Sequence, residues 1–332
     1  MNHASHGIGL IGAGYWGKNL LRNFDALNSL AGLFDISPDS RAKYAALYPH
    51  AEVYGDIEAM LGDGAIRALA IATPAATHGD LVARALHAGK HVFVEKPLCL
   101  DVVEGEKLKA LAEKKGLVLM VGHLLLYHPA FRVLLETARN GHMGKLRYIY
   151  SNRLSLGKIR REENALWSFA PHDISMILQL AGGIPRRVIA SGANYLTDGV
   201  ADTTLSHLVM DDNLQAHIYV SWLHPFKEQK LVVVGEQAMI VFDDTRDAAQ
   251  KLLLYRHKVG WEGELPIVSK AAPEPLEFDA SEPLRNECQA FLDAIGGISE
   301  PPSGAAEGIR VLKVLQACQQ SILRGTAIDL ES

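Results

Sequence analysis

Residues 8–17 have the sequence IGLIGAGYWG, and the residues that follow, KNLLRNF, have the spacing of a helix. An apolar strand, the pattern G-x-G-x-x-G and then a helix form the arrangement by which a Rossmann domain binds a dinucleotide. Gly12 allows a tight turn, Gly14 lets the backbone approach the pyrophosphate, and Gly17 lets helix and strand pack closely. The pyrophosphate is expected on the unpaired N–H groups at the start of the helix.

A second apolar run, residues 30–34, ends in Asp35, about 20 residues after the glycines. A carboxylate there accepts hydrogen bonds from the ribose hydroxyls of NAD and repels the 2′-phosphate of NADP. Two alternatives stay open. Asp35, Ser37 or Asp39 is also suited to cap the helix that follows, and Arg41 is close enough in sequence to reach a 2′-phosphate. The pattern favours NAD.

Composition places limits on the class of protein. A chain of 332 residues, 48% hydrophobic, is long enough for two domains with a sizeable core. A net charge of −5 argues against nucleic acid or an anionic membrane as the main partner. The three cysteines are far apart, which predicts free thiols, a cytoplasmic location and no metal site. No signal peptide and no membrane span are expected.

Apolar runs alternate with helical patterns up to about residue 122, which predicts an α/β domain over 1–122 with a doubly wound parallel sheet. Ligands in such sheets bind beyond the carboxyl ends of the strands. The expected strands are 8–11, 30–34, 52–54, 68–72, 91–94 and 118–121, and the expected helices are 15–26, 38–47, 57–61, 76–88 and 102–115.

Residues 123–332 are predicted to form a second, α+β domain, because several segments alternate apolar and polar residues with a period of two. Residues 203–210 and 214–222 are expected to pair as a hairpin, and the polar face of that sheet, with His217, Tyr219 and Ser221, is suited to a second subunit. The region 258–275, rich in Pro and Gly, is interpreted as a loop. The other expected strands are 145–155, 187–195, 230–234, 238–242 and 251–255, and the expected helices are 127–141, 282–295 and 305–324.

The sequence Glu95-Lys96-Pro97 follows the buried strand 91–94 at the edge of the sheet where ligands bind. Pro97 cannot continue the ladder, so the chain turns and Lys96 lies at the mouth of the crevice. An ammonium beside a nicotinamide is suited to stabilise a substrate alkoxide. The alternative is an ordinary solvated lysine at a strand end.

His172 is a candidate general base. Helical periodicity starts near Pro171, which predicts His172 in the first turn of a helix, where the positive end of the dipole favours a neutral imidazole. The alternative is a histidine that only contacts the start of the helix, with Asp173 as the partner of the dipole.

These motifs together resemble the Gfo/Idh/MocA family of oxidoreductases. The residues that carry the resemblance are Gly12, Gly14, Gly17, Thr73, Pro74, His78, Glu95, Lys96, Pro97 and His172. The resemblance implies a Rossmann domain, an open-faced and mainly antiparallel sheet domain, and dimers or tetramers assembled through that sheet. It also implies reversible oxidation of a sugar or cyclitol hydroxyl, with Lys96 and His172 at the reacting carbon. Many members carry an aspartate four residues before the histidine, where this chain has Ser168.

Residues 14–20, 121–129 and 164–167 further resemble nucleotide-sugar 3-dehydrogenases. That resemblance implies oxidation of a UDP-sugar, with UDP-N-acetylglucosamine the best match, to a 3-keto sugar that an aminotransferase converts to a 2,3-diamino sugar. The alternatives are the corresponding uronic acid, a free sugar or inositol, and a non-catalytic NAD-binding regulatory protein.

A cluster of cations precedes His172 and is suited to the phosphates of a UDP-sugar, although Glu162 and Glu163 make a solvated loop the alternative. His123 and Tyr127 are suited to line the sugar pocket, and Tyr127 is equally suited to the core. The expected substrate-binding residues are Lys96, His123, Tyr127, Arg153, Lys158, Arg160, Arg161, Asn164, Trp167 and His172. The expected cofactor-binding residues are Gly12, Gly14, Tyr15, Trp16, Gly17, Asp35, Thr73, Pro74, His78, Glu95 and Lys96.

Overall fold

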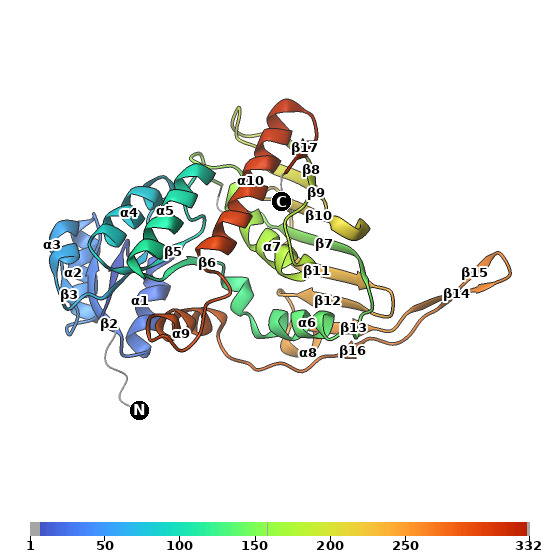
Figure 1. Cartoon of the computed structure of the whole chain (residues 1–332), viewed down its shortest axis with the longest axis horizontal. Helices are drawn as coiled ribbons and strands as arrows, with labels where there is room; N and C mark the ends of the chain where they lie inside the picture. The colour runs from blue at the N-terminus through green and yellow to red at the C-terminus, as the bar shows by residue number, and fades with distance from the viewer. Residues whose placement is uncertain (1–6, 158, 331–332) are drawn as a thin grey trace. The chain divides into compact units, whose positions relative to one another are not determined.

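The computed structural model describes residues 7–157 and 159–330, and the chain divides into two compact units (Figure 1). The first unit comprises Met1–Tyr127 and Glu282–Leu312, and the second comprises His128–Ser281 and Lys313–Ser332. The boundary expected from the sequence lies after residue 122. The grouping differs because a helix from near the end of the chain packs into the first unit.

The first unit contains a six-stranded parallel sheet in the order β3-β2-β1-β4-β5-β6. Its central strands β1 and β4 are buried along their whole length, as expected for a sheet covered on both faces. The order reverses between β1 and β4, so the crevice for a ligand lies beyond the carboxyl ends of these strands. The strands are β1 (Ile8–Ile11), β2 (Leu30–Phe34), β3 (Glu52–Val53), β4 (Ala68–Ile71), β5 (His91–Glu95) and β6 (Leu119–Gly122).

Helices follow the strands of this sheet, which confirms the predicted doubly wound α/β fold. They are α1 (Gly17–Ala26), α2 (Pro38–Leu47), α3 (Ile57–Gly62), α4 (His78–His87), α5 (Val102–Lys115) and α9 (Pro283–Ile295), with short 3-10 turns η1 (Ala75–Thr77) and η2 (Leu124–Tyr127). Helix α9 belongs here because the Phe291 ring packs against Phe93 on β5 and Phe24 on α1, at centroid distances of 5.8 and 6.4 Å. The division between the units falls within α10 (Ala305–Arg324).

The second unit contains a nine-stranded sheet in the order β16-β13-β12-β11-β7-β10-β9-β8-β17. All of its pairings are antiparallel except the one between β7 and β10, which confirms a mainly antiparallel sheet and the predicted hairpin of β9 and β10. The strands are β7 (Leu146–Leu154), β8 (Arg187–Ala193), β9 (Thr203–Val209), β10 (Gln215–Ser221), β11 (Glu228–Gly235), β12 (Met239–Asp243), β13 (Leu252–Tyr255), β16 (Glu274–Pro275) and β17 (Ile328–Asp329).

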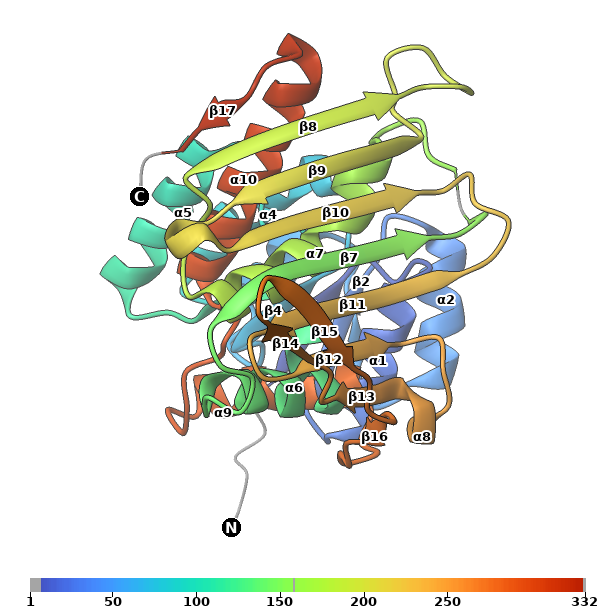
Figure 2. The same ribbon diagram turned by 90° about the vertical axis from the view of Figure 1, so that its right-hand side faces the viewer.

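One face of this sheet packs against α7 (Ala165–Ala181), and the opposite face is open in Figure 2. Side chains alternate accordingly, since Ile149 and Ile218 are fully or almost fully buried whereas Tyr148 and His217 are half-buried on the open side. Ser221, expected on the open face, is buried at the end of β10. The remaining helices of this unit are α6 (Pro129–Arg139), α8 (Ala248–Lys251) and the 3-10 turn η3 (Asp211–Asn213).

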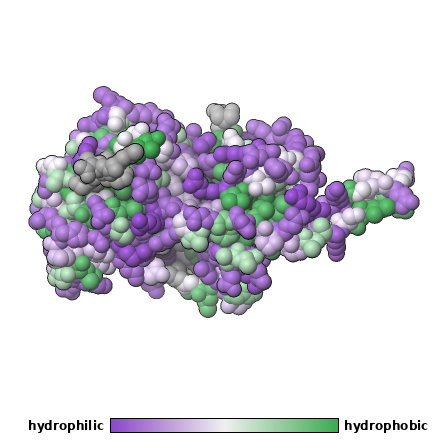
Figure 3. All heavy atoms as spheres, turned by 90° about the horizontal axis from the view of Figure 1, so that it is seen from below, coloured by the Kyte–Doolittle hydropathy of each residue, from purple (hydrophilic) through white to green (hydrophobic). Residues whose placement is uncertain are grey.

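The interpretation of residues 258–275 as a loop was wrong. Strands β14 (Lys258–Glu262) and β15 (Leu265–Ser269) form a hairpin that projects from the second unit (Figure 1). Gly263, with φ of +61°, takes the first central position of its two-residue turn, as the turns favoured in hairpins require. The hairpin has exposed apolar side chains, and Figure 3 shows apolar residues along this projection. They are Val259, Trp261, Leu265, Ile267 and Val268.

Candidate functional site

The turn after β1 has the shape that the glycine pattern predicts. Gly12 has a φ of +92°, and a side chain at Gly17 is excluded because its Cβ would lie 1.8 Å from the Gly12 carbonyl oxygen. A Cβ at Gly14 would meet no atom within 4 Å, so the space over this residue is open. Two glycines are therefore required by the protein itself, while the third leaves room for a ligand against the backbone. This shape fits a dinucleotide pyrophosphate.

Asp35 lies directly after β2, at the same edge of the sheet. Its Oδ2 accepts a hydrogen bond of 2.7 Å from the Ala13 N–H in the glycine-rich turn, and its Oδ1 accepts one of 2.8 Å from the Ser37 N–H. Ser37 is the residue that caps α2, through a bond from the Ser40 N–H. Each carboxylate oxygen of Asp35 still has acceptor capacity for a ribose hydroxyl. Arg41 donates to the carbonyl oxygen of Asp35 at 2.7 Å.

His78 connects the loop after β4 to the turn after β5. Its Nδ1 lies 2.7 Å from the Pro97 carbonyl oxygen, and its Nε2 lies 2.9 Å from the Thr73 carbonyl oxygen. Both partners are carbonyl oxygens, which only accept hydrogen bonds. Whichever ring nitrogen carries the proton therefore donates a hydrogen bond to one of these two loops. The side chain is buried, which fits a role in positioning Thr73 and Pro74 at the crevice.

Glu95 is bonded to two of the predicted cofactor segments. The Trp16 indole Nε1 donates to its Oε1 at 2.5 Å, and the Lys96 N–H donates to its Oε2 at 3.4 Å. Burial raises the pKa of Glu95 to about 7, although the neighbouring Lys96 and the Trp16 hydrogen bond act in the opposite direction. The structure thus brings the glycine-rich turn and the Glu95-Lys96-Pro97 turn together, as the parallel sheet predicts.

His123 and Tyr127 lie in the interior of the first unit. His123 Nδ1 is 2.5 Å from Glu307 Oε2, with both side chains almost fully buried. The Tyr127 hydroxyl bonds Ser303 at 2.8 Å, and burial raises its pKa well above the ordinary value. These contacts agree with the alternative that Tyr127 is a core residue, and the sugar-pocket role of both residues stays a prediction.

Arg153 and Asp173 form a buried ion pair in the second unit that the sequence analysis did not foresee. Arg153 Nε donates to Asp173 Oδ2 at 2.7 Å and its Nη2 donates to Oδ1 at 3.1 Å, while Ser151 donates to the same carboxylate at 2.5 Å. The Arg153 fork is thus directed at Asp173 on α7. The period of two along β7, which places Ser151 and Arg153 on the inner face, was the available signal.

The other predicted substrate residues of the second unit lie near the start of α7. Arg160 pairs with Glu163 at 2.8 Å, and the Arg161 N–H donates to Glu162. Asn164 caps α7 by accepting from the Trp167 N–H, and both Asn164 Nδ2 and Trp167 Nε1 donate to Gln319 Oε1, at 2.8 and 3.2 Å. Lys158 lies outside the described residues.

The predicted position of His172 in a first helical turn was wrong. Helix α7 begins at Ala165, and Pro171 lies inside it, so His172 is in the middle of the helix. The reason is the Asn164 cap, which starts the helix earlier than the proline suggested. The helix dipole therefore gives no particular support to a neutral His172. Ser168, one turn before His172, is buried.

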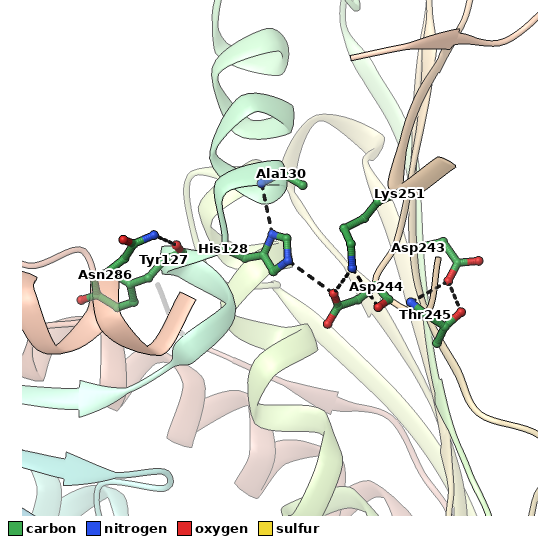
Figure 4. A network of polar contacts seen from close by, with 8 residues as sticks. All are labelled: Tyr127, His128, Ala130, Asp243, Asp244, Thr245, Lys251 and Asn286. Carbon is green, nitrogen blue, oxygen red and sulfur yellow. Dashed lines mark hydrogen bonds and ion pairs between the residues drawn. The ribbon is translucent and has the colours of Figure 1, made fainter. Parts of the chain in front are cut away.

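A polar network around His128, missed by the sequence analysis, fixes the start of α6 (Figure 4). His128 Nδ1 accepts from the Ala130 N–H at 3.1 Å, so the proton of the neutral ring is on Nε2, which faces Asp244 Oδ1 at 3.3 Å. Lys251 bonds the same carboxylate at 2.7 Å. Although burial opposes ionisation, His128 and Lys251 lower the pKa of Asp244 to about 2. The hydrogen bond from Asn286 to the Tyr127 carbonyl, also in Figure 4, belongs to the first unit.

Within residues 7–157 and 159–330, no group of three or more His, Cys, Asp or Glu side chains is arranged to hold a metal ion. No helix in that part of the chain is long and apolar enough to span a membrane.

Two models of protein families match the chain. The model of the GFO/IDH/MocA oxidoreductase family, described as an NAD-binding Rossmann fold, matches residues 6–123, and that of the GFO/IDH/MocA C-terminal domain matches residues 131–241. The chain belongs to the Gfo/Idh/MocA family. NAD is the cofactor, and the glycine-rich turn and Asp35 are the features of the structure that fit it. The dehydrogenase class predicted from the motifs is supported by this membership.

Several relatives align with nearly the whole chain of this family member. UDP-N-acetylglucosamine 3-dehydrogenase of Acidithiobacillus ferrooxidans is 29% identical, over 92% of this chain and 93% of the relative. A solved structure of that enzyme, GnnA, matches with a TM-score of 0.83 at 26% identity, covering 95% of this chain and 97% of the other. A crystal structure titled as a putative oxidoreductase from Magnetospirillum magnetotacticum matches with a TM-score of 0.81 at 32% identity, covering 94% and 98%.

Proposed function

We propose that the protein oxidises the C3 hydroxyl of UDP-N-acetylglucosamine to the 3-keto sugar with NAD as the hydride acceptor. The observation that carries the proposal is the junction at the edge of the parallel sheet, where Glu95 bonds both Trp16 of the NAD-binding turn and the backbone of Lys96. These two bonds support a position of the Lys96 backbone near the turn that we propose for the cofactor. The choice of sugar rests on the similarity, along nearly the whole chain, to the Acidithiobacillus ferrooxidans enzyme.

Each step of the chemistry has a candidate residue. Lys96 donates a hydrogen bond to the C3 oxygen and stabilises the alkoxide that forms as hydride leaves. His172 accepts the hydroxyl proton. NAD, when bound, supplies the hydride acceptor. In the oxidation the proton leaves the C3 oxygen and the hydride leaves C3. Both transfers are reversible, so the same residues serve the reverse reduction.

The phosphates of the substrate need cationic partners. Arg153 is neutralised by Asp173, so Arg160 and Arg161 are the better candidates among the described arginines of this region. Arg160 is paired with Glu163, and both are partly accessible, so exchange of this partner for a phosphate is feasible. Truncation of Arg160 and Arg161 to alanine is expected to raise KM for the UDP-sugar. An unchanged KM would favour a substrate without phosphate, such as inositol.

The direct test is NADH formation with UDP-N-acetylglucosamine, UDP-N-acetylglucosaminuronate and myo-inositol in parallel. An aminotransferase with its amino donor is added, because it removes the 3-keto product and draws an uphill oxidation forward. Turnover with UDP-N-acetylglucosamine alone supports the proposal. Turnover with inositol alone contradicts it, and turnover with the uronate alone moves the assignment to that sugar.

We also propose that an aminotransferase consumes the product and that the enzyme works in the cytoplasm. A 3-keto sugar is the substrate that transamination requires for a 2,3-diamino sugar. The cytoplasm fits Cys99, Cys288 and Cys318, which are buried free thiols.

A non-catalytic NAD-binding regulator is the rival function. It would be supported if a variant with both Lys96→Ala and His172→Ala kept the full biological effect of the parent chain.

A second copy of the chain is the partner we propose for the open face of the sheet in the second unit. At usual strand and residue spacings this face covers about 800 Å², and a standard interface buries about 800 Å² on each partner. Ile189 and Leu205 are about half exposed on it. Leu205→Glu is expected to reduce the sedimentation coefficient of the parent oligomer, whereas Leu323→Glu, at an exposed leucine of α10, is not. A monomeric parent would rule this out.

A further inference from the structure

Glu287 interrupts an otherwise apolar face of α9. The buried residues of this helix are Leu284, Glu287, Cys288, Phe291 and Leu292. Glu287 has no exposed surface, and neither of its carboxyl oxygens has a hydrogen-bond partner among the described residues. An ionised carboxylate in such a place is strongly unfavourable. The cofactor chemistry described above gives this residue no role.

The packing of α9 places Glu287 beside Glu95. Phe291 packs on Phe93 of β5, and Glu287 lies one helical turn before Phe291, about 6 Å along the helix. Glu95 lies two residues after Phe93 on the same face of the strand, about 6.6 Å further on. The Asn286 side chain bonds the Tyr127 carbonyl, beyond the carboxyl end of β6, so α9 begins at this edge of the sheet and runs opposite to β5.

The electrostatics of the two carboxyls agree with this placement. Burial, together with the charge of Glu95, holds the pKa of Glu287 well above its ordinary value. Burial likewise raises the pKa of Glu95 to about 7. Lys96 and His123 lower the pKa of Glu95. Glu287 in turn raises the pKa values of Tyr127 and Cys288, and Arg22 and Glu282 also act on Cys288.

We propose that the Glu95 and Glu287 carboxyls together carry a single proton, and that this singly protonated pair positions the Trp16 indole and with it the glycine-rich turn that receives NAD. Glu287 is then a positioning residue that acts through Glu95. When the last proton leaves, two carboxylates face each other. Glu287 is enclosed, whereas Glu95 is partly accessible, so Glu95 is the side chain that moves and Trp16 loses its acceptor. The inference concerns cofactor binding and does not depend on the sugar.

The sign of the pH effect follows from the direction of the shifts. Both pKa values lie above the ordinary glutamate value of 4.5, so the folded state binds these protons more tightly than the unfolded chain does. The stabilisation is complete below about pH 4.5 and is lost as the pH rises through the folded-state values. NAD affinity is therefore expected to fall on the alkaline side.

Calorimetric titration with NAD in the absence of any sugar, from pH 6 to pH 9, tests the proposal. In the parent protein the dissociation constant is expected to rise by up to about tenfold for each pH unit above the transition. Glu287→Gln keeps the shape of the side chain but cannot ionise, so its affinity is expected to change little over this range. Glu282→Gln, at the N-cap of the same helix but partly exposed, is the matched control and is expected to follow the parent. A parent without pH dependence, or a Glu287→Gln variant that keeps it, overturns the proposal.

Two spectroscopic measurements remain decisive if Glu287→Gln fails to fold. The parent alone is expected to show the infrared carbonyl band of a protonated carboxyl at pH 7, where ordinary Asp and Glu are ionised. The absence of this band overturns the proposal. The Trp16 contribution to fluorescence, taken as the difference between the parent and Trp16→Phe without NAD, is expected to change with the same midpoint as NAD affinity. A constant contribution also contradicts it.

Discussion

At the scale of single residues, the three glycines of the turn after β1 have different physical roles. Gly17→Ala forces its Cβ onto a backbone oxygen, so we expect a lower melting temperature. Gly14→Ala adds a methyl group to open space, so we expect an unchanged melting temperature and at least about tenfold weaker NAD binding, which corresponds to 1.4 kcal/mol. Thermal unfolding and NAD titration of both variants check this. Equal NAD affinity in Gly14→Ala and the parent would contradict it.

The Arg153–Asp173 pair gives a second prediction at this scale. Asp173→Asn leaves a buried guanidinium without its counter-charge, which is expected to reduce the free energy of unfolding by about 3–5 kcal/mol. Glu163→Gln, which breaks the more accessible pair with Arg160, is the control and is expected to cost less than about 1 kcal/mol. Urea denaturation measures both. Similar losses in the two variants would show that burial does not distinguish these pairs.

At the scale of elements, the Asp244 network ties the start of α6 to the end of β12 and to α8. Asp244 has a pKa lowered to about 2, from an ordinary 3.8, by His128 and Lys251. Its contribution to stability is therefore present above about pH 3.8 and is lost as the pH falls through 2, and it amounts to about 2 kcal/mol at neutral pH. Asp244→Asn is expected to remove this loss from the acid limb of a stability–pH curve. An acid limb identical to that of the parent would contradict the assignment.

Elements with strong local signals were predictable from the sequence. The strand, glycine turn and helix at residues 8–26 were recognised because an apolar run, three spaced glycines and a helical pattern follow one another directly. Helix α7 was started too late because Pro171 looks like a first-turn proline, although Asn164 caps the helix earlier. The β14–β15 hairpin was missed because Gly263 and Pro266 look like loop residues, and both are compatible with an edge hairpin.

Glu287 shows a different limit of sequence reasoning. A glutamate in an amphipathic helix is ordinarily assigned to its solvated face, and only the packing of Phe291 on β5 shows that this one faces the core. The Arg153–Asp173 pair is a similar case, since its partners come from β7 and α7. The period of two along β7 indicates that Arg153 faces inward, but nothing in either segment identifies the partner that it meets there.

At the scale of the whole molecule, the first unit depends on the distal segment 282–312. A fragment of residues 1–127 lacks α9, so the ring of Phe291 no longer covers Phe24 and Phe93. We expect this fragment to unfold well below the temperature of the intact chain, and a chain joining 1–127 to 282–312 by a flexible linker to recover most of the difference. Calorimetry of the two fragments tests this. A fragment 1–127 as stable as the linked chain would contradict it.

The nine-stranded sheet has a consequence for synthesis on the ribosome. Strand β7 lies between β10 and β11, and both neighbours are translated more than sixty residues after it ends. Both edges of β7 therefore leave the ribosome before β10 and β11 have been synthesised. The first unit also still lacks α9 at that point. A nascent chain of this protein therefore exposes an unpaired strand while the sixty or more residues between β7 and its neighbours are translated. Its yield in the cell is thus expected to respond to elongation speed and to the supply of chaperones that bind extended apolar segments.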